Sequence, residues 1–305
     1  MKVSIIIPTI GGREKEFKKN FFSLLRLLKN QKVSYEIIVL VDESEETKKY
    51  LENLKKNNKR IIVLFSKTRR GRCKSKNIGA YKAKGDILLF LDDDVRILGR
   101  KYFEFLLDNF KKDKVGAVGG REIKPKKISK IKRLVSKKVG IITSLGEVIS
   151  NFDINMKSPL KVLALPGCNF AVKREVFIKA GGFDENYDVG TAYREETDLQ
   201  IRINKLGYSL IFDPRMKVLH EEEETPKSFK KWFEWYFILN TYFFLKNFKP
   251  DLFKLLFFIY KEVVGSLARL CIYKKPYPII YFYKIFEGIS YFRKCRKNVD
   301  SILYV

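Results

Sequence analysis

Cysteine and histidine are scarce in this chain of 305 residues, which argues against several kinds of site. The four cysteines, at positions 73, 168, 271 and 295, have no CxxC spacing. A disulfide framework or a structural zinc site is therefore not expected, and a reducing cytosol fits this pattern. The N-terminus MKVSIIIPT also predicts no export signal, because its short apolar stretch ends at Pro8 without a small-residue cleavage site.

Long apolar runs and glycine-rich phosphate loops are missing too. The longest uncharged run, Trp235 to Leu245, is too short to span a bilayer, which needs roughly 20 apolar residues. There is no Walker A sequence and no GxGxxG after the first predicted strand, which argues against phosphotransferases and dehydrogenases. Acidic residues are the minority, and the net charge of +27 predicts a phosphate-rich substrate, a nucleic acid or an anionic membrane as partner.

The first half of the chain alternates apolar runs with amphipathic stretches. We predict strands over residues 3–10, 35–42, 60–65 and 86–92, and helices over 17–31, 46–58 and 74–85. Near-continuous apolar strands separated by helices are typical of an α/β fold with a parallel sheet covered on both faces. Ligands bind such sheets at the carboxyl ends of the strands, where Pro8, Thr9 and Asp42 are expected.

One predicted strand, DILLFLDDD at residues 86–94, ends in three consecutive carboxylates. Side chains alternate along an extended chain, so Asp92 and Asp94 are expected to project together while Asp93 points the other way. Two converging carboxylates repel each other unless a cation lies between them, and a hard divalent ion is the natural choice. The alternative is a solvated turn or a helix cap.

Five motifs in order resemble the family 2 glycosyltransferases, which have the GT-A fold. They are IIIPTIGGR, IIVLVDES, KTRRGRCKSKNIGAYKAKGDILLFLDDDV, PGCNFAVKREVFIKAGGFDE and REETDLQIRINKLGYSLIFDPRMKVLH, and together they cover roughly residues 1–222. The resemblance implies a mostly parallel central sheet flanked by helices in a domain of residues 1–225. Its nucleotide-binding half would be about 1–120 and its acceptor-binding half about 121–225, followed by a helical, aromatic-rich extension over 226–305.

The resemblance also implies roles for the polar residues near the strand ends. The nucleotide-sugar would contact Pro8, Thr9, Asp42, Lys76, Asn77, Asp92 and Asp93. Asp94 and His220, the only histidine, would hold a divalent cation, Mn²⁺ or Mg²⁺. Without the resemblance, a lone histidine is more often structural.

A second acidic cluster, Glu195, Glu196 and Asp198, precedes the amphipathic pattern of the helix predicted after it. Acidic residues in a first helical turn are favoured by the helix dipole, so capping is one interpretation for these residues. The resemblance points instead to Glu196 as the general base, with Glu195 and Asp198 as competing choices. Gly167, Asn169, Asp184 and Glu195 would line the acceptor side, and Gly181-Gly182 is expected to form a turn.

The basic stretch KTRRGRCKSK at residues 67–76 has three interpretations. Clustered Arg and Lys neutralise phosphates from any source, including nucleic acid. The position of the stretch between two predicted strands favours contact with a diphosphate or with the domain's own acidic site. A solvated loop is the third possibility.

From Phe229 onward the chain is dense in aromatic residues flanked by Lys and Arg. This composition favours helices that lie in a membrane interface, with cations towards anionic lipid. The alternative is a helical extension that packs on the domain or forms a dimer.

Two functions of different classes follow from these patterns. The first is an inverting, metal-dependent transferase that moves a sugar from a UDP- or GDP-linked donor to a glycan or lipid-linked acceptor, peripheral on the cytoplasmic face of a membrane. The second is a non-catalytic basic module that binds nucleic acid or membrane. The acidic motifs favour the first, because a phosphate-binding surface would not place carboxylates at the sheet edge, and no nucleic-acid partner is expected.

Overall fold

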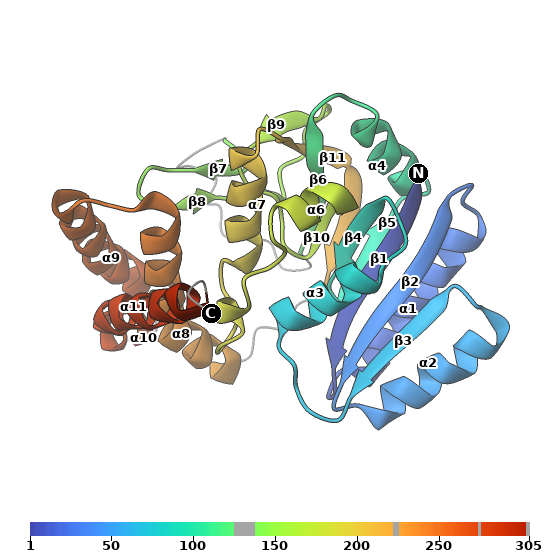
Figure 1. Cartoon of the computed structure of the whole chain (residues 1–305), viewed down its shortest axis with the longest axis horizontal. Helices are drawn as coiled ribbons and strands as arrows, with labels where there is room; N and C mark the ends of the chain where they lie inside the picture. The colour runs from blue at the N-terminus through green and yellow to red at the C-terminus, as the bar shows by residue number, and fades with distance from the viewer. Residues whose placement is uncertain (125–137, 222–225, 274–275, 303–305) are drawn as a thin grey trace.

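Figure 1 shows the computed structural model, which describes residues 1–124, 138–221, 226–273 and 276–302. A nine-stranded sheet forms the centre of this part of the chain, with eight strands in the order β3-β2-β1-β4-β10-β6-β11-β5 and β9 paired to β11. The strands are β1 (Lys2–Ile10), β2 (Ser34–Asp42), β3 (Ile61–Ser66), β4 (Ile87–Leu91), β5 (Val95–Leu98), β6 (Val115–Ile123), β9 (Leu160–Val162), β10 (Asn169–Lys173) and β11 (Ser209–His220). The α/β prediction is confirmed.

Most of the strands run in one direction. β3, β2, β1 and β4 are parallel neighbours, and β6 and β11 are parallel to each other. β10 is antiparallel to both β4 and β6, so β6 runs the same way as β4. The chain moves outward from β1 to β2 and β3 and then returns to place β4 on the other side of β1. The carboxyl ends of β1 and β4 therefore form a topological switch point, where α/β sheets bind their ligands.

Helices cover both faces of the sheet because the strands are apolar on both faces. Ile5 and Ile7 of β1 pack with α1 (Glu14–Lys29), α2 (Glu45–Asn57) and α4 (Tyr102–Phe110). Ile6, between them, faces α3 (Arg72–Lys82), α6 (Arg174–Lys179) and α7 (Glu195–Lys205). The alternation of neighbouring residues between two cores is the period-two pattern of a strand buried on both sides. The four strands and three helices predicted in the first half are confirmed to within a few residues.

Shorter elements complete the acceptor-binding half of the chain. A hairpin joins β7 (Ile141–Ile142) to β8 (Val148–Ile149), and a 3₁₀ turn, η1, spans Glu185–Tyr187. Gly181 and Gly182 have φ values of +77° and +67°, so the predicted turn is present in a conformation that favours glycine.

The C-terminal segment is helical, as predicted. It consists of α8 (Pro226–Phe248), α9 (Leu252–Tyr273), α10 (Tyr277–Ile280) and α11 (Lys284–Ile302), which lie together beside α7 (Figure 1). Leu239 and Phe243 of α8 belong to the same buried cluster as Ile6 of β1. The predicted boundary near residue 225 is therefore not a boundary of the hydrophobic core.

The structure corrects one expectation about this segment. The segment from Phe229 onward was expected at a membrane interface, but within it Phe237, Leu239 and Phe243 are fully buried against the rest of the chain. The run Trp235–Leu245 therefore packs on the domain, as the alternative interpretation proposed, and membrane association of the rest of the segment stays a prediction. Within the described ranges, every helix is too short or too polar to serve as a transmembrane span.

Candidate active site

The loop after β4 places its three carboxylates at the switch point of the sheet. Asp93 turns towards β1, where the Thr9 hydroxyl donates a 2.7 Å hydrogen bond to its Oδ2. Arg13, just before α1, donates to Asp93 Oδ1 at 2.8 Å and to Asp94 Oδ2 at 2.7 Å. The Arg13 guanidinium thus lies across two of the carboxylates and offsets part of their repulsion. Arg13 had no role in the sequence-based prediction.

Strand pairing brings Asp94 to the only histidine. Val95 of β5 is the register partner of His220 at the end of β11, and the Glu221 amide donates to the Asp94 carbonyl at 3.0 Å. His220 Nε2 consequently lies 3.2 Å from Asp94 Oδ1. Ligand atoms of Asp92, Asp94 and His220 all lie within 4.8 Å of one another. The predicted convergence of Asp92 and Asp94 is present, with Asp93 turned to Thr9.

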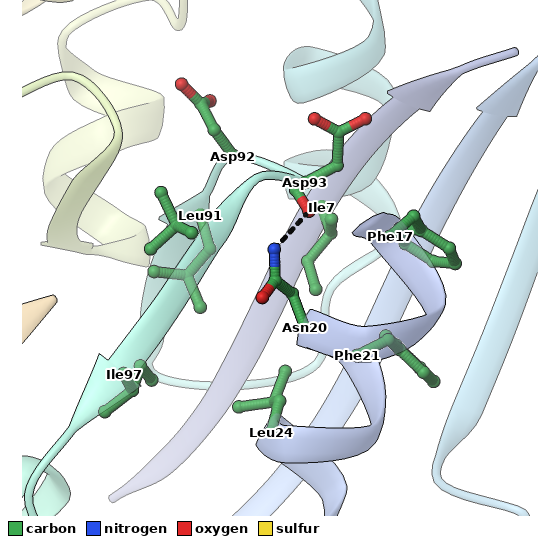
Figure 2. A pocket seen from close by; sticks show the side chains of 10 residues that line it. Ile7, Phe17, Asn20, Phe21, Leu24, Leu91, Asp92, Asp93 and Ile97 are labelled. Atoms are coloured by element: carbon green, nitrogen blue, oxygen red, sulfur yellow. Dashed lines mark hydrogen bonds between the residues drawn. The ribbon is translucent and has the colours of Figure 1, made fainter. Parts of the chain in front are cut away.

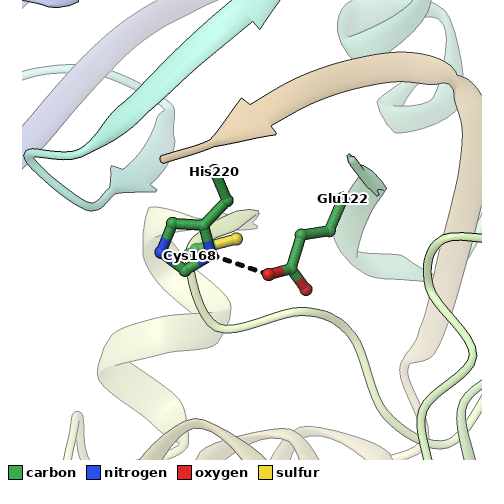
Figure 3. Close-up of side chains that lie close together, drawn as sticks. All are labelled: Glu122, Cys168 and His220. Atoms are coloured by element: carbon green, nitrogen blue, oxygen red, sulfur yellow. Dashed lines mark hydrogen bonds and ion pairs between the residues drawn. The ribbon is translucent and has the colours of Figure 1, made fainter. Parts of the chain in front are cut away.

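Glu122 of β6 contacts the other ring nitrogen of His220. Its Oε1 lies 2.6 Å from Nδ1, and Cys168 lies close by, as Figure 3 shows. Although burial lowers the pKa of His220, the neighbouring Asp94, Cys168 and Glu122 raise it overall. The sequence analysis missed Glu122, because it lies 98 residues from His220 and only the parallel pairing of β6 with β11 brings the two together.

The residues around Asp94 fit a divalent cation. Asp94 Oδ1 is buried and makes no hydrogen bond, although His220 Nε2 is near it. A buried carboxylate oxygen without a hydrogen-bond partner is costly unless something else satisfies it. Burial raises the pKa of Asp94, but His220 and Arg13 outweigh burial and lower it to about 2. An ionised oxygen beside a second carboxylate and an imidazole is a suitable set of donors for such an ion.

Asp93 differs from Asp94 in its electrostatics. Burial is the largest effect on its carboxyl group and raises the pKa to about 6, despite the contacts with Arg13 and Thr9. Its two oxygens already accept bonds from those two side chains. Asp93 therefore positions Thr9 and Arg13, and the predicted contact with the nucleotide-sugar stays a prediction.

Lys76 links the acidic loop to the second acidic cluster. This lysine of α3 is completely buried, and its Nζ lies 2.8 Å from Glu196 Oε1 and 3.9 Å from Asp92 Oδ1. Arg72, one turn earlier in α3, lies 3.5 Å from Glu195. With Arg70, described below, these residues of the basic stretch contact the domain's own carboxylates, whereas Lys67, Arg69 and Lys74 are exposed. The predicted contact of Lys76 with the nucleotide stays a prediction.

Glu195 and Glu196 are adjacent in α7 but have opposite electrostatics. Glu195 is 1 % exposed, and burial together with the charge of Glu196 raises its pKa. Burial also raises the pKa of Glu196, but Lys76 and Arg72 outweigh burial and lower it. Glu196 is therefore the ionised carboxylate of the pair at neutral pH. It also lies beside Gly167, where an added Cβ would come within 2.6 Å of the Glu196 carboxyl carbon.

Asp198 and Asp184 bind the C-terminal helices. Asp198 accepts hydrogen bonds from Arg202 on its own helix and from Lys246 and Asn247 of α8. Asp184 accepts from Tyr242 and Lys246 of α8. The N-cap of α7 is Arg194, whose side chain makes no capping bond, and the three acidic residues lie in the first turn, where the helix dipole favours them. Asp198 is fully buried and bonded to Arg202 and α8, which favours Glu196 over it as the base, and contact of Asp184 with the acceptor stays a prediction.

Two asparagines predicted in the site make internal contacts. Asn77 accepts a hydrogen bond from the Phe183 amide and donates to the Phe183 carbonyl, which fastens α3 to the loop after Gly182. Asn169 begins β10, is fully buried, and accepts a hydrogen bond from the Tyr102 hydroxyl. These bonds give Asn77 and Asn169 positioning roles. The predicted contacts of Asn77 with the nucleotide and of Asn169 with the acceptor stay predictions.

Asp42 and Pro8 lie at the carboxyl ends of β2 and β1, as predicted. Asp42 accepts a 2.6 Å bond from Arg70 Nε, and Arg70 also donates to the carbonyls of Val41 and Leu64. Pro8 lies beyond Ile6, the last residue of β1 paired with β4, where its missing amide costs no hydrogen bond to β4. Contact of either residue with a base stays a prediction.

A small pocket lies behind the acidic loop, between α1 and the strands (Figure 2). Its lining includes Ile7, Phe17 and Leu91, and Asn20 Nδ2 donates to the Asp93 carbonyl at 3.5 Å. In Figure 2 the Asp92 and Asp93 carboxylates point away from these apolar side chains. The pocket therefore lies below the loop, and its lining includes no lysine or arginine that could bind a diphosphate.

This arrangement, with acidic side chains at the switch point of a mostly parallel sheet, is that of the GT-A glycosyltransferases. The family model for glycosyl transferase family 2 matches residues 4–181. The chain belongs to glycosyl transferase family 2.

Curated relatives agree with this assignment. A probable glycosyltransferase of Bacillus subtilis, YdaM, is 27 % identical over 230 residues, which are 74 % of this chain and 52 % of that protein. The O-antigen biosynthesis protein RfbC of Myxococcus xanthus is 23 % identical over 158 residues, covering 50 % of this chain and 12 % of the relative. The matched residues are thus about half of the first relative and a small part of the second.

Solved structures share the fold at low sequence identity. The mannosyltransferase PcManGT from Pyrobaculum calidifontis, in complex with GDP-Man and Mn²⁺, has a TM-score of 0.59 at 16 % identity and covers 95 % of this chain and 86 % of its own. S. aureus TarS in complex with UDP-GlcNAc has a TM-score of 0.55 at 14 % identity, over 83 % and 69 % of the two chains. The likeness to the mannosyltransferase covers both the sheet and part of the C-terminal helical segment.

Proposed function

We propose that this chain is an inverting, metal-dependent glycosyltransferase that moves a sugar from a nucleotide-diphospho-sugar to an acceptor hydroxyl. The observation that carries the proposal is Asp94 Oδ1, a buried oxygen without a hydrogen bond that faces His220 Nε2 and Asp92 at the sheet edge. Two proteins of the same fold are solved with GDP-Man or UDP-GlcNAc, so UDP- and GDP-linked sugars are the donors to test.

Asp94 and His220, with Asp92 within reach, would hold the divalent cation. Such an ion stabilises the charge that develops on the leaving diphosphate. The imidazole in the donor set favours Mn²⁺ over Mg²⁺, because Mg²⁺ prefers an all-oxygen environment. The Mn²⁺ in the mannosyltransferase complex supports this choice.

Cationic side chains of the chain itself would bind the phosphates. The Arg13 side chain is 46 % exposed and holds Asp93 and Asp94 through its two terminal nitrogens. With a divalent ion held by Asp94, the guanidinium would be available to a phosphate oxygen, for which its planar fork is well suited. Arg72, with its side chain also 46 % exposed, offers a second cation at the N-terminus of α3.

Glu196 would act as the general base. Its carboxylate is ionised because Lys76 and Arg72 lower its pKa, and it is more exposed than Glu195, with side-chain exposures of 13 % and 1 %. In an inverting displacement the acceptor oxygen attacks the anomeric carbon opposite the leaving nucleotide and gives its proton to this base. One base on the acceptor side is sufficient, and no covalent intermediate forms on the enzyme.

The acceptor is proposed to be a glycan or a lipid-linked hydroxyl. The segment before Glu195 packs directly on α8, with the Tyr193 ring 5.6 Å from Trp232 and Arg194 bonded to Asn240. The acceptor side of the site is therefore continuous with the C-terminal helices. A surface on those helices could present an acceptor close to Glu196.

A donor screen that scores nucleotide release tests the proposal. UDP- and GDP-linked sugars are each incubated with the full chain in Mn²⁺, in Mg²⁺ and in EDTA, with and without a membrane-lipid extract as acceptor source. We expect release from one donor class, dependent on Mn²⁺ and lost in the Asp94→Asn variant. Equal release in EDTA would exclude the metal role.

The stereochemistry of the product decides between inversion and retention. NMR of the anomeric proton in the first product should show the configuration opposite to that of the donor. No release with any donor, combined with binding to nucleic acid, would favour the non-catalytic module. The contacts of Arg70 and Lys76 with the domain's own carboxylates support the transferase over that alternative.

A further inference from the structure

Helix α9 carries an apolar face that the rest of the described chain leaves uncovered. Its largest exposed side chains are Leu252, Phe253, Leu256, Phe257, Tyr260 and Leu267, with Phe253 80 % and Leu252 72 % exposed. Between Leu252 and Cys271 every exposed position is apolar or tyrosine, and no charged residue is among them. In Figure 1, α9 lies at the edge of the molecule farthest from β3 and α2, so this face is accessible.

The exposed positions form one continuous stripe. At about 100° per residue they cover roughly 160° of the helix circumference, and the 22 residues extend over about 33 Å. The opposite side carries Glu262, which is buried and bonded to Arg269, and Phe258, which stacks on Phe244 of α8. The helix is thus anchored through one side and presents the other along its whole length.

Exposed apolar stripes of this size mark contact surfaces. Lys254 and Lys261 lie along one border of the stripe, with ammonium groups 5.6 Å and 5.4 Å from the rings of Phe248 and Phe258. Aromatic residues on the apolar face with lysines at its border are the pattern of a helix that lies in a lipid interface.

We propose that α9 docks the protein on an anionic bilayer, with this stripe buried at the boundary between headgroups and acyl chains. The charge of the chain supports lipid over a second copy. Each chain carries a net charge of +27, which is attracted to anionic headgroups and repelled by another copy. The free cysteines of the described chain fit the cytoplasmic face. The docking stands on α9 alone and does not depend on glycosyl transfer.

Flotation of the full chain with liposomes tests the proposal. Vesicles of phosphatidylcholine alone are compared with vesicles that also contain phosphatidylglycerol, at low and high salt. We expect flotation with the anionic vesicles, weaker binding as salt screens the charges, and little binding to neutral vesicles. A protein that stays unbound on every vesicle would overturn the proposal.

Two double variants separate the α9 stripe from general charge effects. Phe253→Glu with Phe257→Glu should lower the partition coefficient by roughly 10- to 100-fold or more, because two aromatic anchors are lost. The control is Phe22→Glu with Ile178→Glu, which changes two exposed apolar residues of α1 and α6 and adds the same charge. Both double variants change the net charge equally, so a difference between them reports on the α9 stripe. The Phe22/Ile178 variant should lose only the binding that this change in charge removes.

Three results would contradict lipid docking by α9. Equal loss in both double variants would attribute the binding to net charge alone. Full binding of the Phe253/Phe257 variant would place the membrane contact elsewhere. The stripe would be assigned to self-association if the unaltered chain is dimeric by sedimentation and fails to float, and the Phe253/Phe257 variant is monomeric. Nucleotide release without lipid is measured in parallel, so failure of docking is distinguishable from failure of the transferase.

Discussion

Neighbouring side chains give chemically identical groups different properties in this site. Glu195 and Glu196 are consecutive, yet the pKa of the first is raised by burial and that of the second is lowered by Lys76. Lys76, 2.8 Å from Glu196, and Arg72 account for much of this difference. The electrostatic environment thus supports the proposal that Glu196 is the general base, a choice that the residue type alone left open.

Replacement of Glu196 by Gln should abolish turnover but preserve donor binding. The amide keeps the size of the side chain but cannot accept the proton, so kcat should fall by roughly two to four orders of magnitude while donor Kd changes little. Glu195→Gln should keep much of the activity, because burial and the charge of Glu196 raise the pKa of Glu195 and favour its neutral form. Glu147→Gln, at an exposed position in the β7–β8 hairpin, is the matched control. An inactive Glu195→Gln beside an active Glu196→Gln would reverse the assignment.

Glu122 should control metal affinity without touching the metal. Its carboxylate holds Nδ1 of His220 at 2.6 Å, which orients Nε2 towards Asp94. A carboxylate partner makes an imidazole ligand a stronger donor, and its loss typically costs 10- to 100-fold in affinity, so about tenfold is expected for Glu122→Gln. Calorimetry with Mn²⁺ in the absence of donor measures this effect. Unchanged Mn²⁺ affinity, with Glu147→Gln as control, would leave Glu122 a purely structural contact.

The helices after β11 are joined to the domain by ionic contacts as well as apolar ones. Lys246 of α8 reaches both Asp184 and Asp198, at 2.6 Å and 2.9 Å. Asp184 also accepts a 2.7 Å bond from Tyr242. Burial raises the pKa of Asp184, but Lys246 and Tyr242 outweigh it and the net shift is downward. This carboxylate therefore contributes stability in its ionised form.

The variant Asp184→Asn should be less stable at neutral pH by about 1–3 kcal/mol, because a charge-assisted buried contact is lost. The folded pKa lies below that of the unfolded chain, near 4, so this contribution is complete above that pH and is lost as pH falls through the folded pKa. Urea unfolding should show a smaller difference in the free energy of unfolding between the variant and the unaltered chain at pH 3 than at pH 7. Asp108→Asn, which removes an exposed pair with Lys111, should be close to neutral at both pH values. If this difference in the free energy of unfolding does not change with pH, the ionic role of Asp184 is contradicted.

Elements with strong local patterns could be predicted from the sequence, and contacts between distant segments could not. β1 and β4 were predictable because their apolar runs and flanking residues are local signals. The contacts of Arg13 with Asp93 and of Glu122 with His220 join residues 80 and 98 positions apart and follow only from strand order. The run Trp235–Leu245 was misassigned because an aromatic helix has the same composition whether lipid or protein covers it. Packing against neighbouring helices buries this run.

One of the hydrophobic clusters extends across the predicted boundary at residue 225. Tyr242 and Phe243 of α8 and Cys295 of α11 belong to the cluster that contains Ile6, Phe90 and Phe177. Removal of residues 226–305 would expose this surface to water. The C-terminal helices are thus part of the folded unit. They differ from the helices that cover the sheet because α9 leaves an apolar face exposed.

This shared core predicts that the sheet and the C-terminal helices unfold together. Both tryptophans, Trp232 and Trp235, lie in α8, so tryptophan fluorescence reports on that helix alone. Trp235 packs so closely on Gly190 that a Cβ there would lie 2.0 Å from its ring, and unfolding of α8 should therefore change the signal strongly. The urea midpoint from fluorescence should coincide with that from pulsed hydrogen exchange of β1 and β4, as a cooperative transition requires. The Trp232→Phe/Trp235→Phe double variant checks that no other residue contributes to the fluorescence. A fluorescence midpoint well below that of the strands would show that α8 separates first, and would make the C-terminal helices a unit that docks on an independently stable domain.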